Sequence, residues 1–440
     1  MQNKKKKTGL CFFPAFDWSI SPTHPEREER LLYTYDQLKE EGIFDLDEIE
    51  EINPSLIQEE PILRTHICVP DVSSNITDSH KIACGGVLAL ADRIMEGSLK
   101  NAFALVRPPG HHAMKVVYGN RGFCNINHEA ILVDYLRSRY GLKKIAVIDT
   151  DCHHGDGTQD IFWNDPNVLC ISMHQDGRTL YPGTGFVHEA GGPTAYGKTL
   201  NIPLPPETGE KGFLMTVKDC ILPILEDFKP DFIINSAGQD NHYTDPITNM
   251  RFSSQGYARL TELLKPDIAV LEGGYAIEGA LPYTNLGILL ALAGLDYSFV
   301  KEPDYTLEKV SENKERDQYI QDVLKQVGQV WKTKEKARET FKADKDGFFS
   351  RTKRIFYDTD GISDLQLEKV KDCPHCSGFN LIDSKCREKR ISALAVMIPF
   401  HCCKNCREEA LYLYEKASGF SYVYLQNQLD NEFLKKGGVI

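Results

Sequence analysis

Short apolar stretches alternate with longer amphipathic segments over the first three hundred residues of the chain. Each apolar stretch ends at turn residues or charged residues, and helical patterns lie between the stretches. We expect strands at 102–106, 144–148, 168–172, 232–236 and 268–272, and helices at 128–140, 212–228 and 254–264. Because the strands are almost continuously apolar, the pattern predicts an α/β fold whose mainly parallel sheet is covered by helices on both faces.

Segments rich in His and Asp follow directly after these expected strands. In parallel sheets of this type, ligands bind outside the carboxyl ends of the strands. The polar segments are 107–113, 149–159, 174–185, 238–242 and 273–275. We therefore expect them to converge on one site.

The composition of the chain changes near position 300. Residues 301–372 are dense in charge and contain few Gly or Pro. Within this part, 318–331 repeats apolar residues at a helical period, which predicts a packing helix. We expect a first domain at 8–333, a charged linker at 334–372 and a small cysteine-rich domain at 373–440.

Composition and net charge narrow the classes of function. Hydrophobic residues make up 41% of the 440 positions and charged residues 26%, which is typical of a globular protein. No apolar run approaches the roughly 18 residues that a membrane-spanning helix needs, and the apolar stretch after the lysines at 4–7 is too short for a signal peptide. A net charge of −12 argues against extended nucleic-acid binding by the whole chain.

The 13 cysteines fall into two groups. The first is scattered over the first half of the chain, and the second is concentrated between positions 373 and 406. An odd count without a secretory signal is typical of a reducing compartment, so we expect a cytoplasmic protein. We interpret the second group as metal-binding.

The segment that follows the expected strand at 144–148 carries a candidate metal site. Residues two apart on an extended segment share a face, so Asp151 and His153 point the same way. A carboxylate and an imidazole are half of a catalytic zinc site, which takes three protein ligands and keeps one position open. Asp240, which follows another buried strand and a flexible glycine, is the best candidate for the third ligand.

Two adjacent histidines, His111 and His112, follow a Pro-Pro-Gly turn near the same expected site. They could be metal ligands or general acid and base groups. The spare carboxylates of Asp149 and Asp156 favour the second role, because each can orient one imidazole through its second ring N–H. Tyr275, after two glycines at a strand end, could support an oxyanion with its hydroxyl.

Seven motifs in this order resemble one known family. They are RPPGHHA (107–113), GFCNIN (122–127), DTDCHHGDGTQ (149–159), ISMHQ (171–175), YPGTG (181–185), SAGQD (236–240) and LEGGY (271–275). Over about residues 8–333 the chain resembles the histone deacetylase family, including its bacterial acetylpolyamine and acetoin-utilisation relatives. The resemblance implies the arginase-like three-layer α/β fold.

The resemblance also implies roles for residues at the matching positions. The zinc ligands would be Asp151, His153 and Asp240. The catalytic groups would be His111, His112 and Tyr275, with Asp149 and Asp156 as the partner carboxylates. The acyl-amine tunnel would be lined by Gly122, Phe123, Tyr181 and Ile247. A structural potassium ion would be bound by Asp149, Asp151, His153, Ser172 and the backbone of Met173.

Several residues of this chain differ from those of arginases or from the common residues of the histone deacetylase family, and these differences bear on the expected metal and substrate. Arginases share the fold but bind two manganese ions, and the positions of their extra ligands are Gly155 and His242 here, which favours one catalytic metal. Gln239 and Asn241, which flank Asp240, also differ from the common family residues. The rim loop at 114–121 differs as well, so substrate choice is not inherited from the family. The apolar Ile247 stands near the position where polyamine-selective relatives place a Glu at the rim, and this favours acetyl-lysine.

The function that the resemblance implies is the zinc-dependent removal of an acetyl or other acyl group from an amine, with acetyl-lysine in a protein as the expected substrate. Two alternatives stay open: a small acylated amine such as an acetylpolyamine as the substrate, and a catalytically silent module that binds acyl-lysine. Ferrous iron could replace zinc at the same ligands. The sequence defines no oligomeric state, and we expect no membrane partner.

Two CxxC pairs, Cys373 with Cys376 and Cys403 with Cys406, suit a tetrahedral structural zinc ion. With strand-like segments at 392–400 and 410–414, they predict a zinc-ribbon-like β domain. The alternatives are a redox dithiol pair, cysteines that bind no ligand, and other metal ligands, namely His375, Cys386, His401 and Cys402. We do not expect the catalytic domain to bind nucleic acid; for the ribbon, recognition and plain folding both stay open.

Overall fold

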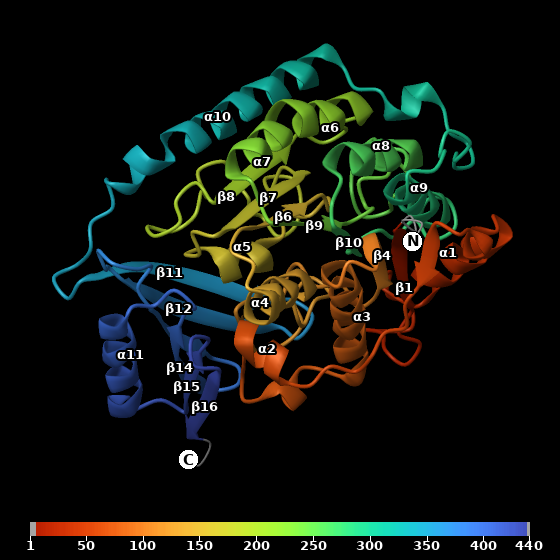
Figure 1. Cartoon of the computed structure of the whole chain (residues 1–440). Coiled ribbons are helices and arrows are strands. Elements are labelled where there is room, and N and C mark those ends of the chain that lie inside the picture. The colour runs from red at the N-terminus through yellow and green to blue at the C-terminus, as the bar shows by residue number, and fades with distance from the viewer. Residues whose placement is uncertain (1–5, 438–440) are drawn as a thin grey trace, which may run out of the picture.

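A parallel sheet of eight strands forms the centre of the first three hundred residues in the computed structural model, which describes residues 6–437 (Figure 1). All neighbouring strands of this sheet run parallel. Across the sheet their order is β2 (Ile49–Glu51), β1 (Lys7–Phe13), β4 (Leu99–Val106), β10 (Ile268–Leu271), β9 (Phe232–Ala237), β6 (Ile145–Asp149), β7 (Val168–Gln175) and β8 (Thr199–Leu204). The five expected strands all lie in this sheet, so that prediction is confirmed.

Helices cover both faces of the sheet. Successive residues of each strand face opposite sides, so apolar side chains point from both faces and each face packs against helices. In β4, for example, Phe103 and Leu105 belong to one hydrophobic core, whereas Ala102 and Ala104 belong to the other. The first core is closed by α1 (Glu29–Glu40), α6 (Glu210–Thr216), α7 (Leu222–Phe228), α8 (Ser254–Leu264), α9 (Leu281–Ala293) and α10 (Lys314–Arg338). The second is closed by α2 (Glu60–Thr65), α3 (Asp78–Met95), α4 (His128–Tyr140) and α5 (Asp156–Phe162). The predicted three-layer α/β fold is therefore confirmed.

Shorter elements complete this part of the chain. A π-helical turn, Val217–Ile221, joins α6 to α7, so the expected helix at 212–228 is interrupted but present. Single 3₁₀ turns are formed by Ile43–Asp45, Val72–Ser74 and Leu307–Val310. A two-stranded parallel ribbon pairs β3 (Ile67–Cys68) with β5 (Val116–Val117). No helix of the described residues is both long and apolar enough to span a membrane.

The C-terminal part of the chain forms a second, six-stranded sheet. Its order is β11 (Phe348–Tyr357), β12 (Ile362–Lys371), β13 (Asn380–Cys386), β14 (Ile391–Ile398), β15 (Tyr422–Asn427) and β16 (Glu432–Gly437). Only β14 and β15 pair in parallel, and α11 (Lys404–Lys416) connects them. The expected separate β domain with a cysteine cluster is confirmed. The lysines at positions 4 and 5 and the last three residues of the expected 373–440 domain lie outside the described residues.

Two expectations for this region are wrong. The expected linker at 334–372 contains the end of α10 and both strands of the hairpin β11–β12. The reason is an inverted pattern in β12, whose buried side chains include the polar Asp364, Gln366 and Glu368, whereas Leu365 and Leu367 are exposed. The expected strand-like segment at 410–414 belongs to α11, where the buried residues recur at helical spacing.

The two sheets share a hydrophobic core, so the C-terminal domain is fixed against the first one. Val116 and Tyr118, in and beside β5, pack in one cluster with Ile355, Tyr357 and Ile382 of the C-terminal sheet. The other face of that sheet is covered by α11 and the cysteine cluster. Figure 1 shows the long hairpin β11–β12 reaching from this sheet toward α4 and α5.

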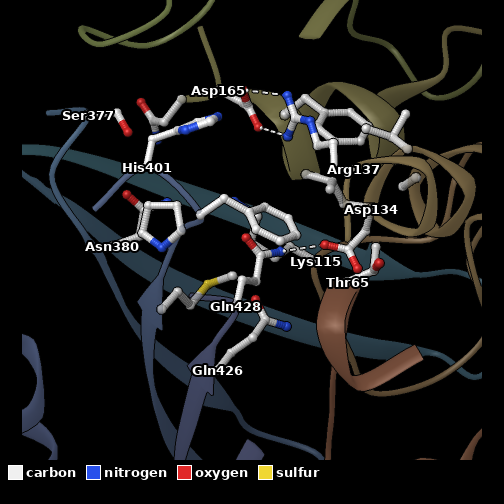
Figure 2. Close-up of a pocket in the computed structure, with 18 of the residues that line it drawn as sticks. Thr65, Lys115, Asp134, Arg137, Asp165, Ser377, Asn380, His401, Gln426 and Gln428 are labelled. Atoms are coloured by element: carbon white, nitrogen blue, oxygen red, sulfur yellow. Dashed lines mark hydrogen bonds and ion pairs between the residues drawn. The ribbon is translucent and has the colours of Figure 1, made fainter. Parts of the chain in front are cut away.

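Polar contacts also cross the interface between the two domains. Buried Glu368 of β12 bonds to Arg351 of β11, and Arg351 and Lys353 both pair with Asp160 of α5. A pocket lies nearby in the same interface (Figure 2), where Arg137 of α4 forms an ion pair with Asp165, with its Nη2 3.1 Å from Oδ1. The interface therefore combines an apolar core with buried charge.

Candidate active site

Three candidate metal ligands meet at the carboxyl ends of two neighbouring strands. Asp151 and His153 follow β6, and Asp240 follows β9, which pairs with β6 in the sheet. One ligand atom from each residue lies within 4.8 Å of the other two, and all three residues are buried. His153 Nδ1 is 2.7 Å from Asp240 Oδ2 and 3.2 Å from Asp151 Oδ1. The structure thus brings together the three residues predicted to bind zinc.

Glycines leave the space in which these carboxylates lie. A Cβ at Gly238 would stand 1.9 Å from Asp151 Oδ2, and one at Gly273 would stand 2.5 Å from Asp240 Oδ2. The backbone N–H of Gly273 also donates a 2.7 Å hydrogen bond to Asp151 Oδ2. The glycines of the SAGQD and LEGGY motifs are therefore required by close packing against the ligands.

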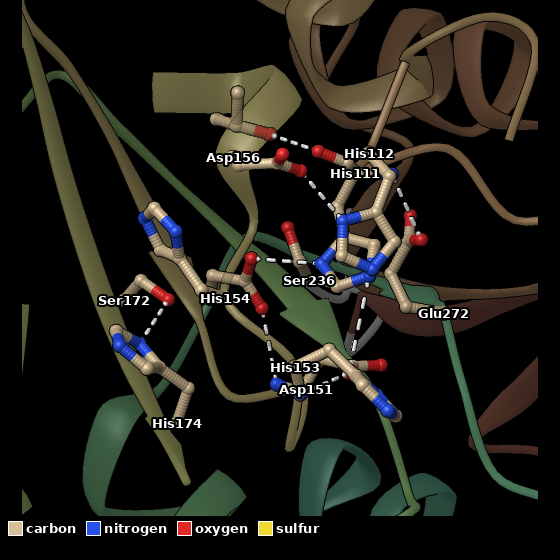
Figure 3. Close-up of polar contacts among 12 residues, drawn as sticks. His111, His112, Asp151, His153, His154, Asp156, Ser172, His174, Ser236 and Glu272 are labelled. Carbon is tan, nitrogen blue, oxygen red and sulfur yellow. Dashed lines mark hydrogen bonds and ion pairs between the residues drawn. The ribbon is translucent and has the colours of Figure 1, made fainter. Parts of the chain in front are cut away.

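The tandem histidines each contact the carboxylate expected to orient them. His111 Nδ1 lies 3.0 Å from Asp149 Oδ2, and His112 Nδ1 lies 2.7 Å from Asp156 Oδ1 (Figure 3). The centres of the two imidazole rings are 4.0 Å apart. The Nδ1 atoms are thus occupied by carboxylates, which leaves the Nε2 atoms as the remaining polar atoms of the rings.

The two imidazoles differ in their electrostatic surroundings. Burial alone would lower the pKa of His111, but the carboxylates of Asp151, Asp149 and Glu272 raise that pKa well above its ordinary value. For His112, burial and the neighbouring charge of His111 lower the pKa to about 4. The two adjacent imidazoles are therefore shifted in opposite directions, with the pKa of His111 raised and that of His112 lowered.

Two residues that the sequence analysis did not single out support this pair. Arg121 Nε donates a 3.0 Å hydrogen bond to Asp156 Oδ2, and its guanidinium offsets the effect of burial and holds the pKa of that carboxyl below its usual range. Glu272 Oε2 accepts hydrogen bonds from the backbone N–H groups of Gly110 and His111, at 2.8 and 3.0 Å. Arg121 lies in the divergent loop at 114–121 and Glu272 in the LEGGY motif, so both had a sequence signal.

A cavity of about 210 Å³ leads to these groups. It is lined by Pro109, His111, His112, Gly122, Phe123, His153, Leu180, Tyr181, Ile247, Gly273, Tyr275 and Asp358. The four residues expected to line a tunnel are all among them. The sequence analysis did not expect Asp358 at the cavity, because this residue belongs to the turn between β11 and β12 in the C-terminal domain.

Tyr275 is held in place by its backbone and by its ring. Its N–H donates to Asp245 Oδ2 at 2.8 Å, and the Arg30 guanidinium lies 5.0 Å from the ring centre. Burial raises the pKa of Tyr275 well above its ordinary value, so the hydroxyl stays protonated and can act as a donor.

The residues that depart from related patterns have partners of their own. A Cβ at Gly155 would stand 2.0 Å from Asp149 Oδ2, so a side chain here would disrupt the His111 contact. His242 Nε2 lies 3.2 Å from Glu302 Oε1. Asn241 donates to the carbonyl of Thr150 at 2.8 Å. Gln239 Nε2 bonds to Asn285 Oδ1.

Of the residues predicted to bind potassium, Asp149 lies on β6, Ser172 and Met173 lie on β7, and Asp151 and His153 follow β6. Ser172 pairs in register with Asp149, and its Oγ lies 2.8 Å from His174 Nδ1 (Figure 3). Met173 is fully buried on the same strand. The potassium site stays a prediction.

The four cysteines of the two CxxC pairs converge in the C-terminal domain. Their sulfur atoms all lie within 4.8 Å of one another, and Cys373 Sγ is 3.9 Å from Cys403 Sγ. The first pair lies between β12 and β13, and the second lies at the start of α11. The other candidate ligands, His375, Cys386, His401 and Cys402, are not part of this group.

Comparisons with known proteins place this arrangement among known sequences and structures. The profile of the histone deacetylase domain matches residues 70–285. A probable deacetylase of Archaeoglobus fulgidus is 43% identical over 360 residues, which cover 74% of this chain and 99% of that protein. The acetoin utilization protein AcuC of Bacillus subtilis is 31% identical, over 68% of this chain and 85% of its own length. The crystal structure of the HDA15 HD domain superposes with a TM-score of 0.65 at 28% identity, over 77% of this chain and 99% of that one.

Proposed function

The chain belongs to the histone deacetylase family, and from this we propose that it is a zinc-dependent amidohydrolase that removes an acetyl or other acyl group from the lysine side chain of a protein. Because the chain belongs to this family, it is a deacetylase. The observation that supports the finer proposal is the arrangement around one cavity: an Asp₂His set, two carboxylate-bound histidines and a buried tyrosine.

Asp151, His153 and Asp240 are the residues that would hold the zinc ion. Two carboxylates and one imidazole fit a catalytic zinc site, which uses three protein ligands and keeps one position for water or substrate. His153 and Gly273 line the cavity, whereas the carboxylates of Asp151 and Asp240 do not. The ligand set therefore lies at the base of the cavity. When bound, zinc would polarise the acyl carbonyl and lower the pKa of a water molecule toward about 7.

His112 is the group that we assign as the general base. Its uncharged state at neutral pH leaves Nε2 free to accept a proton, and Asp156 fixes the opposite nitrogen. Arg121 in turn holds Asp156 as a carboxylate. His111, whose Nδ1 contacts the carboxylate of Asp149, then assists protonation of the leaving amine.

Tyr275 would stabilise the negative charge that develops on the acyl oxygen. Its protonated hydroxyl is a neutral donor at the cavity, and the backbone contact with Asp245 and the Arg30 guanidinium hold the residue in place. Donors fixed before the reaction need no reorganisation when this charge appears.

The proposal is tested by measuring acetate release from acetyl-lysine peptides and from monoacetylated polyamines, with the Asp240→Ala variant as the blank. The protein is first stripped of metal with a chelator and then reloaded with zinc or with ferrous iron. Turnover of peptides that returns with zinc and is absent from the variant supports the proposal. Turnover of polyamines alone contradicts the protein substrate, and turnover only with iron contradicts the zinc dependence.

For the C-terminal domain, we propose that Cys373, Cys376, Cys403 and Cys406 bind a second, structural zinc ion. Four thiolates in two CxxC pairs can close a tetrahedral coordination sphere, which suits a structural role. A small domain with a limited core often depends on such a site. The cytoplasmic location stays a prediction.

A further inference from the structure

The turn between β11 and β12 brings the C-terminal domain to the candidate active site. Asp358, in this turn, is one of the residues that line the cavity, although 236 residues separate it from Gly122 on the cavity wall. The profile of the histone deacetylase domain ends at residue 285. This part of the cavity is therefore a contribution of the appended domain.

The carboxylate of Asp358 is fastened to the wall of the cavity. Its Oδ1 accepts hydrogen bonds from the backbone N–H of Gly122 and from the hydroxyl of Tyr181, both at 3.0 Å. Gly122 itself lies against the reactive groups, because a Cβ there would stand 2.4 Å from His112 Cδ2. The next residue, Phe123, has a φ of 73°, a backbone conformation that residues other than glycine seldom adopt. Asp358 thus bonds to the strained turn that forms one side of the cavity.

Further contacts hold the hairpin turn in place. Asp360 Oδ2 accepts a 2.7 Å hydrogen bond from the N–H of Asn120, and Thr359 Oγ1 donates to the side-chain oxygen of the same residue at 2.7 Å. Arg121 donates to the carbonyl of Phe356. The position of Asp358 is therefore set by a network that runs along the whole rim loop.

No ion pair joins Asp358 to another described residue, although the Arg121 guanidinium lies close enough to interact with its charge. Among the lining residues that the structure describes, it is the only carboxylate, and none is Lys or Arg. The guanidinium of Arg121 is already engaged with Asp156. Oδ1 makes both of the hydrogen bonds described for this side chain, so Oδ2 retains its capacity to accept one. Asp358 is only partly buried, and it lines the cavity, so a ligand in the cavity can reach its side chain.

We propose that Asp358 is a substrate-binding residue that selects acylated amines carrying a positively charged amine or guanidinium group beyond the acylated nitrogen. A fixed carboxylate at a cavity mouth attracts a cation and accepts its N–H groups. The inference rests on the proposed function and adds to it the charge of the preferred substrate. It also offsets the expectation drawn from Ile247, because an acidic group reaches the rim from a different part of the chain.

The inference is tested with matched pairs of substrates that differ only in charge. One pair is a monoacetylated diamine and the N-alkylacetamide of the same length. The other is an acetyl-lysine peptide with Lys or Arg as neighbours and the same peptide with Gln in their place. The first pair tests a free small amine, and the second tests a basic protein segment as the source of the cation.

The variant is Asp358→Asn, which removes the charge but keeps an oxygen that can accept from Gly122 and Tyr181. The control is Asp360→Asn, which removes a charge from the same turn but keeps an oxygen that can accept the Asn120 N–H, so the turn stays in place, and Asp360 does not line the cavity. The wild-type protein should prefer the charged member of a pair by about tenfold in kcat/KM, through KM. Asp358→Asn should reduce this ratio to about one, and Asp360→Asn should leave it unchanged.

A binding measurement keeps this test independent of turnover. Calorimetric titration of the zinc-loaded protein with the charged and neutral ligands should show the same tenfold preference, lost in Asp358→Asn and kept in Asp360→Asn. If the wild-type protein hydrolyses none of the substrates, the proposed function fails, and the binding ratio still decides the role of Asp358. An equal preference in the wild type and in Asp358→Asn, by either measurement, overturns the inference.

Discussion

The two sheets of this protein each hold a candidate metal centre, and the two centres are built in opposite ways. In the parallel sheet, Asp151, His153 and Asp240 lie on loops after strand ends, at the base of a cavity. In the C-terminal sheet, the four thiols lie beside α11 and its apolar cluster. Three mixed donors at a cavity leave a position for a reactant, whereas four thiolates fill a tetrahedral sphere.

This difference separates chemistry from stability within one chain. Changes at the first centre should remove activity and leave the fold intact, since the ligands project from loops after strands that are already packed. Changes at the second should loosen the C-terminal sheet, whose core on that face is small. The predictions below test this separation, in order of decreasing effect.

The largest effect is expected from Asp240→Ala. Removing one of three ligands should abolish zinc binding at this centre and lower acetate release by about 10⁴-fold or more, since the metal supplies several kcal/mol of transition-state stabilisation. The measurement is zinc content together with the initial rate of acetate release. Zinc at the cysteine centre should remain, so the content should fall from two ions to one with an unchanged melting temperature. A loss of both ions would contradict the separation.

Cys376→Ser should act on stability instead. Loss of a structural zinc ion should destabilise the C-terminal sheet by about 4 kcal/mol, measured by urea unfolding and by zinc content. Cys402→Ser is the matched control, because Cys402 is a buried neighbour of the cluster that is outside the four-thiol group. A larger loss of zinc in Cys402→Ser than in Cys376→Ser would show that the ligand set is different.

Tyr275→Phe should lower kcat by about 10²–10³-fold and leave substrate binding almost unchanged, because the hydroxyl acts only where negative charge develops. The measurement is kcat from acetate release, together with calorimetric binding of the substrate. A lower kcat with almost unchanged substrate binding would also exclude a catalytically silent module that binds acyl-lysine. A variant that keeps full activity would remove Tyr275 from the mechanism.

Glu368→Gln probes the charged contact between the two domains and should cost about 2 kcal/mol at pH 7, because it leaves Asp160 as the one buried carboxylate paired with Arg351 and Lys353. Burial alone would raise the pKa of Glu368, but Arg351, Lys353 and Lys115 lower it well below its ordinary value. A carboxyl with a depressed folded-state pKa stabilises the fold above its unfolded value of about 4.3 and loses this effect as the pH falls.

The difference in unfolding free energy between the wild type and Glu368→Gln should therefore shrink below about pH 4.3. Urea unfolding at pH 7 and at successively lower pH measures it. Glu388→Gln, at an exposed position in the turn between β13 and β14, is the control and should stay within about 0.5 kcal/mol of the wild type throughout. A constant difference across this range would rule out the ion pair as the cause.

The parallel sheet was predictable because its strands are buried on both faces and therefore largely apolar, as at β10. The hairpin β11–β12 was not, because Glu368 and its neighbours are polar residues on a buried face, and the ion-pair partners Arg351 and Lys353 of Glu368 lie on another strand, β11. A pattern of hydrophobicity cannot reveal a strand whose inward side chains are charged. Only the three-dimensional partners make such a strand stable.

The candidate site likewise contains residues that the sequence predicts and a residue that it does not predict. Asp151, His153 and the tandem histidines lie in short motifs at strand ends, so spacing along the chain places them correctly. Asp358 lies in no motif, and its contact with Gly122 joins positions 236 residues apart. Contacts of this separation depend on how two domains dock, which local sequence does not encode.

The position of Asp358 in the chain also sets an order of events during synthesis. Domains tend to fold as they emerge, N-terminal parts first. The metal ligands, the histidine pair and Tyr275 are all translated before the β11–β12 hairpin, so the nascent polypeptide can form the reactive centre while the cavity mouth still lacks its acidic residue. On the ribosome, the catalytic groups would thus be assembled before Asp358, the residue that discriminates between substrates.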